Sequence, residues 1–475
     1  MILTAILTII FLSSLLFLER YEKEGLKVTQ VSSFPETDFA RHELSKIVRI
    51  FVLVAGLIFM LTIWLLDLNS LVGIFAILIL IITRISLAWQ TISGAKLTMP
   101  TRLLEALDHP ELASTKAAFY FSGVGHKTAW HFHMWEAYLN QTEKNLLLIL
   151  RERSHFNTER EFGNSVTILV PNSKTLKLID NILEKKLSSV FYANNSMHNS
   201  TIVKRLSNLK HVQLLHGDSD KPPSFHPTAK FYDYLFVAGQ MAIDRYQIHD
   251  IDIPKDRFRI VGRPQVDSIN TDQNLPTKEG IRNIVYMPTW LGFFDDTQFS
   301  SLDRAVKLIN EVLDSHKNIL LHFKPHPLSY KSSQWPILQQ HIKKALKKPR
   351  SSGSSGIYCS TEMPVFDLYN TADLLITDIS SVMIDYLYSG KPLSVVMPTG
   401  LMLGDCKQYP SLAASYNIEP DLSNLPDILE SALHEDPKMK DRLEIRQYAF
   451  GDFGRTAGEA FEEACREVIF HEAGN

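Results

Sequence analysis

Residues 373–382, with the sequence DLLITDISSV, predict a buried strand that passes through a short polar turn into a helix. The run Leu374–Thr377 lacks strict alternation of apolar and polar residues, which is typical of a parallel strand covered on both faces. The residues after the two serines include the apolar side chains Val382, Ile384 and Leu387. A strand that leads directly into a helix is the repeating unit of a doubly wound α/β sheet.

The same alternation of short apolar runs and helical stretches extends outward from this stretch, beginning at about residue 91. The predicted strands are Ala117–Phe121, Leu146–Leu150, Val166–Val170, Ser189–Tyr192, Val212–Leu215, Tyr234–Val237, Ile284–Met287, Ile319–Phe323, Leu374–Thr377 and Leu393–Val396. They are too many for one sheet, and the pattern is interrupted at residues 261–282. We therefore predict an α/β fold of the GT-B type, in which two Rossmann-like domains, residues 91–268 and 269–475, face a cleft. The polar stretch 347–356 (KKPRSSGSSG) is predicted to be a loop without chemistry.

The first ninety residues contain three long apolar runs, Ile2–Leu18, Ile47–Leu66 and Leu71–Ile82, the last of which continues through Arg84 to Trp89. Apolar runs of about 20 residues predict transmembrane helices, so residues 1–90 are expected to form a membrane anchor. The first run lacks a basic segment before it and a small-residue cleavage site after it, which favours a retained helix over a cleaved signal peptide. A re-entrant hairpin formed by the second and third runs is the alternative.

The positive charges between these runs predict how the anchor is oriented. They lie between the first two runs and after the third, at Arg20, Lys23, Lys27, Arg41, Lys46, Lys96 and Arg102. The connection Asp67–Ser70 carries none. Because positive loops stay on the cytoplasmic side, we expect everything after residue 91 to be cytoplasmic and held at the plasma (inner) membrane.

Composition excludes several classes of protein. The formal net charge is −3, whereas a nucleic-acid-binding protein normally has a basic surplus gathered on one face, so no nucleic-acid partner is expected. The cysteines Cys359, Cys406 and Cys465 are widely spaced and include no CxxC pair. This spacing suits a reducing compartment and excludes a disulfide framework or a zinc knuckle. Neither a metal ion nor a cofactor is expected.

Histidines follow two of the predicted strands. His216 stands at the carboxyl end of Val212–Leu215, with Lys221 close behind. The next residue, Gly217, permits a tight turn or a close approach of the backbone. A histidine with an ordinary pKa near 6.5 can act here as a general base.

The second histidine, His326, follows the strand Ile319–Phe323 in a turn with the sequence KPHP. Two prolines fix this turn, and Lys324 lies beside the imidazole. Such a turn presents a cation and a hydrogen-bond donor to a phosphate. A purely structural histidine is the alternative.

Further polar side chains follow two other predicted strands. Thr289, in the sequence YMPTW, can supply a hydroxyl to the same site. Ser380 or Ser381 can cap a helix, whose free amides and dipole favour a phosphate. Asp378, at the end of its strand, can orient a ligand hydroxyl. An ordinary capped helix is the alternative interpretation of this stretch.

Several other patterns favour structural roles. Residues 218–220 and 250–252 both spell DxD, which holds a metal ion in some transferases but is common in loops. Residues 122–125 (SGVG) lack the third glycine of a dinucleotide fingerprint and are interpreted as a tight turn. His131 and His133 lie two residues apart and so on different faces of a helix, which favours packing over metal binding.

Five motifs occur in a fixed order, and together they resemble the CDP-glycerol glycerophosphotransferase family, the teichoic-acid polymerases and primases of bacterial envelopes. They are HG at 216–217, GRPQVD at 262–267, YMPTW at 286–290, KPHP at 324–327 and TDISSVMIDYLYSGKP at 377–392. The resemblance extends over residues 185–460. It implies a GT-B fold and a CDP-linked donor such as CDP-glycerol or CDP-ribitol.

The resemblance also implies roles for individual residues. The histidine of the family's HG motif is placed as the base that deprotonates the acceptor hydroxyl, which here is His216. The histidine of its HP turn is placed against the donor phosphates, which here is His326. The expected donor-binding and phosphate-binding residues are Gly217, Lys221, Arg263, Thr289, Lys324, Thr377, Asp378, Ser380 and Ser381.

We therefore expect an enzyme that transfers glycerol phosphate, or a related polyol phosphate, to a lipid-linked or glycan acceptor and releases CMP. The product would be a teichoic-acid-type or capsule polymer, and catalysis would rest on positioning and charge neutralisation. A GT-B glycosyltransferase that uses a nucleotide sugar is the first alternative. A membrane scaffold with a degenerate transferase domain is the second.

Overall fold

The structure, a computed structural model, describes residues 103–470 except for 106, 124–129, 153–165, 171–172, 272–279, 292–298, 362, 402–407 and 452–453. The predicted membrane anchor lies outside these residues and stays a prediction. Within the described part of the chain, no helix is long and apolar enough to cross a membrane.

The chain divides into two compact units. The first consists of Met1–His126, Glu143–Val190 and Lys204–Leu209, and the second of Lys127–Thr142, Phe191–Val203 and Lys210–Asn475. All of the predicted site residues belong to the second unit. The predicted domain boundary between residues 268 and 269 stays a prediction.

Seven strands form the first sheet, in the order β3-β2-β1-β4-β5-β6-β7. They are β1 (Ala117–Phe121), β2 (Leu147–Leu150), β3 (Val166–Leu169), β4 (Ser189–Tyr192), β5 (Lys210–Gln213), β6 (Tyr234–Val237) and β7 (Phe258–Ile260). The pairs β1–β2, β2–β3, β5–β6 and β6–β7 are parallel. β1 to β4 are buried along their whole length, which is typical of parallel strands covered on both faces.

Six strands form the second sheet, in the order β10-β9-β8-β11-β12-β13, and every neighbouring pair is parallel. They are β8 (Arg282–Met287), β9 (Ile319–Phe323), β10 (Ser355–Tyr358), β11 (Leu374–Thr377), β12 (Leu393–Val396) and β13 (Tyr416–Ile418). This is the strand order of a Rossmann sheet. Successive strands are added on one side of β8 as far as β10, and from β11 onward they are added on its other side. Open α/β sheets bind their ligands at this point, beyond the carboxyl ends of the strands.

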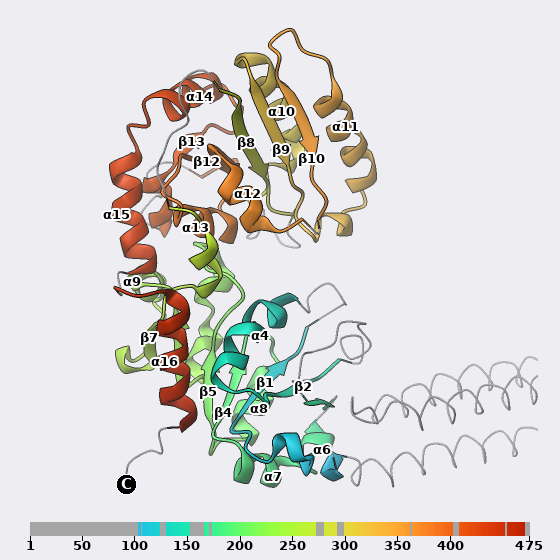
Figure 1. Ribbon diagram of the computed structural model, residues 1–475, viewed down its shortest axis with the longest axis vertical. Helices are drawn as coiled ribbons and strands as arrows, with labels where there is room; N and C mark the ends of the chain where they lie inside the picture. Colours follow the sequence, from blue (N-terminus) through green and yellow to red (C-terminus); the bar gives the residue numbers. More distant parts are fainter. Residues whose placement is uncertain are drawn as a thin grey trace, which may run out of the picture. The chain divides into compact units, whose positions relative to one another are not determined.

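Helices cover both faces of the second sheet (Figure 1). The α-helices of the described residues are α4 (Trp130–Thr142), α6 (Ser173–Leu176), α7 (Asp180–Lys186), α8 (Asn199–Arg205), α9 (Gln240–Ile248), α10 (Ala305–Ser315), α11 (Trp335–Lys347), α12 (Val365–Thr371), α13 (Ser381–Leu387), α14 (Leu425–His434), α15 (Met439–Phe450) and α16 (Ala457–Phe470). Alternate residues of β8 show how this layer is built. Ile284 and Tyr286 pack into a core with α10, α11 and α14, while Val285 and Met287 pack into a second core with α12, α13 and α15. Because side chains along a strand alternate between faces, β8 is apolar on both.

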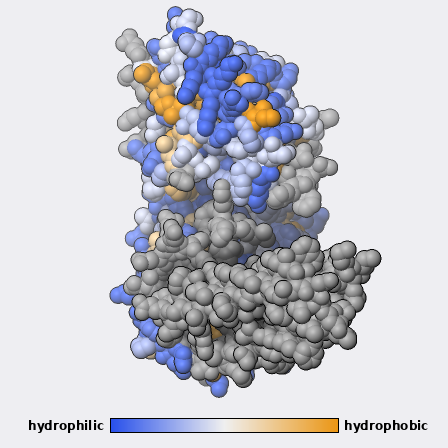
Figure 2. All heavy atoms as spheres, turned by 90° about the vertical axis from the view of Figure 1, so that its right-hand side faces the viewer, coloured by the Kyte–Doolittle hydropathy of each residue, from blue (hydrophilic) through white to orange (hydrophobic). Residues whose placement is uncertain are grey.

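Each face helix presents polar residues away from its core, as α11 illustrates. Its buried residues include Trp335, Ile342 and Leu346. Its outer surface carries lysines such as Lys344, and one large apolar side chain, Ile337, is 64% exposed. The view from the side of α11 is accordingly mostly hydrophilic in this part of the molecule, with isolated hydrophobic spots (Figure 2).

The predicted α/β fold with two parallel sheets is confirmed. Three strands were not predicted, β7, β10 and β13, and all of them are short strands at the edge of a sheet. The prediction of a loop over 347–356 is wrong at both ends, because Lys347 ends α11 and Ser355 begins β10. The predicted strand Val212–Leu215 ends earlier, at Gln213.

Candidate active site

The carboxyl ends of β8 and β11 meet where the strand order reverses, and two side chains join them. Thr377, the last residue of β11, donates its hydroxyl to the carbonyl oxygen of Met287 at 2.7 Å. Asp378 accepts the backbone N–H of Thr289 at 2.7 Å and that of Ser301 at 3.2 Å, both on Oδ2. The predicted site residues Thr289, Thr377 and Asp378 therefore lie together.

Asp378 is completely buried, and its other carboxylate oxygen, Oδ1, has no hydrogen-bond partner among the described residues. Burial raises the pKa of Asp378 from 3.8 to about 6, while its hydrogen bonds and the charge of Lys221 act in the opposite direction. An unpaired buried oxygen costs about 1–3 kcal/mol or more. Such a group is unusual in a native protein, and it marks Asp378 as a candidate for a catalytic or ligand-binding role.

The start of α13 also leaves a polar atom unsatisfied. Ser380 occupies the N-cap position with φ −164° and ψ 172°, but its side chain makes no capping hydrogen bond, so the predicted cap is absent. Its Oγ is buried and, within the described residues, has no hydrogen-bond partner. Gly217 lies against the same turn, because a Cβ built on it would be 2.9 Å from the Cβ of Ser381. This close approach requires glycine, as its place after His216 suggested.

The backbone before His216 is in a strained conformation. Leu215 has φ 56°, in the left-handed region that costs a non-glycine residue about 1–2 kcal/mol. Its N–H donates to Oε1 of Gln213 at 3.1 Å, and its carbonyl accepts the indole N–H of Trp135 at 2.6 Å. Strain of this kind persists only where neighbours hold it, and it is common at functional sites.

Ala193, just beyond β4, sets the tautomer of His216. Nδ1 of His216 lies 3.0 Å from the carbonyl oxygen of Ala193. Because a carbonyl only accepts, Nδ1 carries the proton, and Nε2 of the neutral ring is the acceptor. Burial lowers the pKa of His216 to about 4, helped by Arg263 and Lys221 and opposed by the Ala193 bond. The ring is therefore neutral near pH 7, with Nε2 able to take a proton.

His326 has the opposite tautomer. Its Nδ1 accepts the backbone N–H of Leu328 at 3.1 Å, so the proton of the neutral ring is on Nε2. Burial lowers the pKa of His326 to about 3, and the charges of Lys221 and His216 contribute to this shift. Its ring stacks with that of Trp290, with the centroids 6.4 Å apart. The site thus combines one imidazole arranged to accept a proton with one arranged to donate a hydrogen bond.

Lys221 supplies a positive charge at the same strand ends. Its Nζ donates to Oγ1 of Thr289 at 3.3 Å and lies 6.0 Å from the ring centroid of Phe299. Burial lowers the pKa of Lys221, while the nearby Asp378 raises it. Lys221 therefore connects the loop after β5 with the end of β8.

Two predicted phosphate ligands have other partners. The guanidinium of Arg263 forms a buried two-point ion pair with Asp385 of α13, in which Nη2 lies 3.1 Å from Oδ2. The Nζ of Lys324 donates to the carbonyl oxygens of Ser360 and Thr361, both at 2.9 Å. These contacts give Arg263 and Lys324 partners within the protein, and their expected role at the phosphates stays a prediction.

The DxD sequence at 218–220 is also engaged within the protein. Arg245 of α9, which is fully buried, pairs with Asp218 and, at 2.8 Å between Nη2 and Oδ1, with Asp220. Asp220 further accepts the backbone N–H of Ser411 at 3.1 Å and the hydroxyl of the same residue. The positive charge beside these two carboxylates is therefore supplied by an arginine of the protein itself. In the described part of the chain, no group of three or more His, Cys, Asp or Glu residues can hold a metal ion.

One helix contributes residues that the motifs did not reveal. His131 of α4 stacks on His216, with ring centroids 3.8 Å apart and planes 12° apart, so the packing predicted for it is against the candidate base itself. His133 instead lies 3.0 Å from Glu136, through its Nδ1 and the carboxylate Oε2. Only the spacing of the two histidines was visible in the sequence, and it correctly separated their faces.

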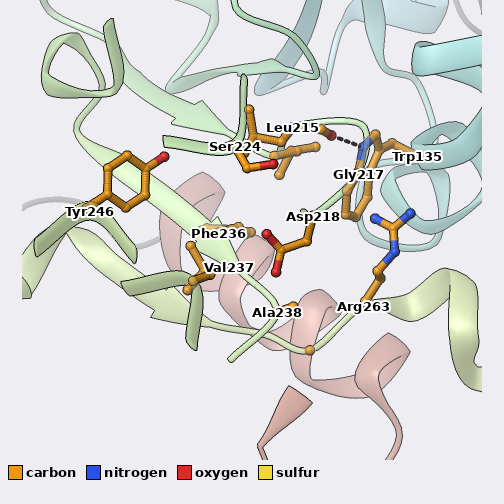
Figure 3. A pocket seen from close by; sticks show the side chains of 13 residues that line it. Trp135, Leu215, Gly217, Asp218, Ser224, Phe236, Val237, Ala238, Tyr246 and Arg263 are labelled. Atoms are coloured by element: carbon orange, nitrogen blue, oxygen red, sulfur yellow. Dashed lines mark hydrogen bonds between the residues drawn. The ribbon is translucent and has the colours of Figure 1, made fainter. Parts of the chain in front are cut away.

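A pocket is lined by Leu215, Gly217 and Asp218, which lie next to His216 in the chain (Figure 3). Its walls are mostly apolar residues at the ends of β5 and β6, such as Phe236 and Val237, together with Trp135 of α4. Asp218 and Arg263 supply its charged groups. Gly217 and Arg263, two of the predicted site residues, are among its lining residues.

A doubly wound α/β chain that gathers two imidazoles, a lysine and a buried carboxylate at its strand ends has the features of a group-transfer enzyme. The family model described as CDP-Glycerol:Poly(glycerophosphate) glycerophosphotransferase matches residues 181–399. The match contains every predicted site residue, from His216 to Ser381, and it confirms the resemblance seen in the motifs. Residues 181–399 are therefore similar to that family, and the protein is a CDP-glycerol glycerophosphotransferase-like transferase.

Solved structures with a similar course of the chain include the wall teichoic acid polymerase TagF, at 15% identity, with coverage of 80% of this chain and 97% of that chain and a TM-score of 0.44. A UDP-GlcNAc 2-epimerase from Neisseria meningitidis bound to UDP-GlcNAc has 11% identity, coverage of 74% and 99%, and a TM-score of 0.47. A putative UDP-N-acetylglucosamine 2-epimerase from Listeria monocytogenes has 10% identity, coverage of 75% and 97%, and a TM-score of 0.48. Similarities this distant say nothing about substrates. No curated protein matches the chain.

Proposed function

We propose that this protein transfers glycerol phosphate, or a related polyol phosphate, from a CDP-linked donor to a hydroxyl of a lipid-linked or glycan acceptor. The product is a polymer of the bacterial envelope, of the teichoic-acid or capsule type. The family match over residues 181–399 supports the type of reaction. The opposite tautomers of His216 and His326 are the observation that carries the proposed mechanism.

In this mechanism His216 is the general base. The acceptor oxygen attacks the phosphorus next to the polyol and forms a new O–P bond, while the bond from that phosphorus to the oxygen of CMP breaks. The acceptor proton moves to Nε2 of His216, and CMP leaves with the bridging oxygen. A general base of this kind contributes about 10²–10⁴-fold to the rate.

His326 and Lys221 stabilise the negative charge on the donor. The Nε2–H of His326 donates to a phosphate oxygen, and the ammonium of Lys221 neutralises charge from the side of Thr289. Preorganised donors of this kind act on the transition state without reorganising. The unsatisfied Oγ of Ser380 gains a partner when the pyrophosphate binds beside α13, which explains why it does not cap the helix.

The experiment uses the purified full-length chain with CDP-glycerol, CDP-ribitol, UDP-sugars and GDP-sugars, each with an envelope lipid extract as acceptor. We expect release of CMP from one CDP-linked polyol. Release of UDP or GDP from a nucleotide sugar would replace the proposal with a glycosyltransferase. No turnover with any donor would favour a scaffold.

The base is tested in the same assay. His216→Ala should reduce turnover by at least 10²-fold while the donor still binds, because the base acts on the acceptor. The matched control is His226→Ala, which removes an exposed histidine bonded to Thr228 in the same part of the chain and should leave turnover unchanged. Normal turnover of the His216 variant would remove it from the mechanism.

A further inference from the structure

The ring of His216 is held in two ways. The bond from Nδ1 to the carbonyl oxygen of Ala193, at 3.0 Å, fixes one edge of the ring. A single bond of this kind still allows the ring to tilt about the bond axis. His131 covers one face at a centroid distance of 3.8 Å and an angle of only 12°, and this contact opposes the tilt.

The helix that carries His131 also forms a hydrogen bond with the backbone of the residue before His216. Trp135 lies one turn after His131, on the same face of α4, and its indole N–H holds the carbonyl of the strained Leu215 at 2.6 Å. Two contacts of α4 therefore converge on one loop, one on the ring of His216 and one on the residue before it.

α4 is itself firmly anchored. Its Met134 carbonyl accepts the side-chain amide of Gln265 at 3.0 Å, and its Tyr138 hydroxyl donates to the carbonyl of Pro264 at 3.0 Å. Trp135 stacks on Phe461 of α16 with the ring centroids 5.1 Å apart. A contact made by such a helix transmits a fixed orientation to the loop that it touches.

From this geometry we propose that His131 is a positioning residue, whose stacked ring holds His216 so that Nε2 faces the acceptor hydroxyl. The proposal rests on the proposed function, because it assigns His216 the role of the base. The orientation of a catalytic group strongly affects the reaction rate, because a displacement of about 1 Å can lower the rate on the order of 10²-fold. A stacked pair of imidazoles also disfavours charging both rings, and Lys221 and Arg263 add to the positive surroundings of His216.

The test compares three variants of the full-length protein. His131→Ala removes the stacked ring, and His131→Phe keeps a flat ring in its place. His133→Ala, on the same helix, is the matched control, because its ring lies against Glu136 and not against His216. We expect His131→Ala to lower kcat about 10–100-fold with little change in donor affinity, while His131→Phe keeps kcat within a few-fold of the parent and the control is unchanged.

A second readout does not need turnover. The rate at which diethyl pyrocarbonate acylates His216, followed by peptide mass spectrometry, should rise in His131→Ala and stay at the parent value in His131→Phe and His133→Ala. An unchanged acylation rate in His131→Ala would show that the stack does not restrain the ring and would overturn the proposal.

The two readouts separate this inference from the proposed function. If no CDP-linked donor is turned over by the parent, the proposed function fails, and the acylation rates still decide whether His131 restrains His216. A different outcome is that the parent turns over normally, but both His131→Ala and His131→Phe lose kcat, donor affinity and folding stability together. In that case the role of His131 is purely structural, and the positioning proposal fails.

Discussion

The buried carboxyl of Asp378, in the candidate site, makes the stability of the fold depend on pH. Its carboxyl is fully buried with one oxygen unsatisfied, and burial raises its pKa from 3.8 to about 6. The folded state therefore keeps the proton in a range of pH where the unfolded chain has released it. The stability that Asp378 contributes is complete below pH 3.8 and is lost as the pH rises through about 6.

We predict that Asp378→Asn is more stable than the parent at pH 8, by about 2 kcal/mol. The amide keeps an oxygen for the N–H groups of Thr289 and Ser301 and removes the buried charge, although Lys221 then loses its counter-charge. The advantage should vanish below pH 4. Turnover should fall at least 10-fold. Chemical denaturation at both pH values measures the difference.

The control for this variant is Asp303→Asn, whose side chain is 65% exposed and should change stability by less than about 0.5 kcal/mol. A loss of stability in Asp378→Asn at pH 8 would contradict the argument, since it would show that the charged carboxylate stabilises the fold.

Gly217 makes a second residue-scale prediction. In Gly217→Ala the new Cβ would lie 2.9 Å from the Cβ of Ser381, so the His216 loop or the start of α13 has to move. We expect kcat/KM to fall at least 10-fold and the free energy of unfolding to fall by about 1–2 kcal/mol. Gly458→Ala is the matched control, because its nearest contact would be an ordinary 3.4 Å. Equal kinetics in the two variants would contradict the close approach.

Sequence could predict those site residues whose chemistry and local position are visible in one stretch of chain. His216, His326 and Asp378 each follow a predicted strand, and the ends of parallel strands gather at one edge of a sheet. His131 could not be assigned to the site in this way, because its partner lies far away in the chain and the stack needs a tertiary fold. The ion pair of Arg263 with Asp385 of α13 is likewise invisible in the local sequence, because the two residues are far apart in the chain.

At the scale of elements, the segment after His216 is held by α9. Arg245 is fully buried, as is Asp220, and its charge balances two carboxylates. Asp220 in turn binds Ser411, so one arginine fixes the segment 218–220 to two other parts of the second unit. Removing one partner of a buried pair costs about 3–5 kcal/mol, because it leaves an uncompensated charge.

We therefore predict that Arg245→Met lowers the free energy of unfolding by about 3–5 kcal/mol. Adding Asp218→Asn and Asp220→Asn should recover part of the lost free energy of unfolding, because these changes remove the two carboxylate charges that Arg245 no longer balances. Arg466→Ala is the control: its pair with Glu462 on α16 is on the surface, and its loss should cost less than about 1 kcal/mol. A triple variant less stable than Arg245→Met would contradict the charge argument.

The strands that could be predicted from the sequence are those that are buried on both faces. β8, β9 and β11 lie inside the second sheet, and each was predicted within two residues of its observed ends because covered parallel strands are continuous apolar runs. β10 was missed because it is an edge strand that starts with Ser355 and Gly356, residues with low strand propensity. β10 is held in a strand conformation by its pairing with β9, because its own residues do not favour one.

At the scale of the whole molecule, the predicted anchor in residues 1–90 would place the active site beside its substrate. A lipid-linked acceptor stays in the membrane, so an enzyme fixed at the same surface meets it in two dimensions and with a limited range of orientations. The charged loops predict that the transferase part is on the cytoplasmic side, where nucleotide-activated donors are made.

We predict that the full-length chain stays in the membrane pellet after an alkaline carbonate wash, because three apolar runs of near-spanning length resist extraction. A chain that lacks residues 1–90 should lose this resistance and should use a detergent-dispersed lipid acceptor less efficiently, while its affinity for the CDP-linked donor stays the same. In inverted vesicles, protease should digest the part after residue 91, and in right-side-out vesicles it should not. Release of the full-length chain by carbonate would contradict an integral anchor, whereas protection in inverted vesicles would reverse the orientation and require a donor on the outer side.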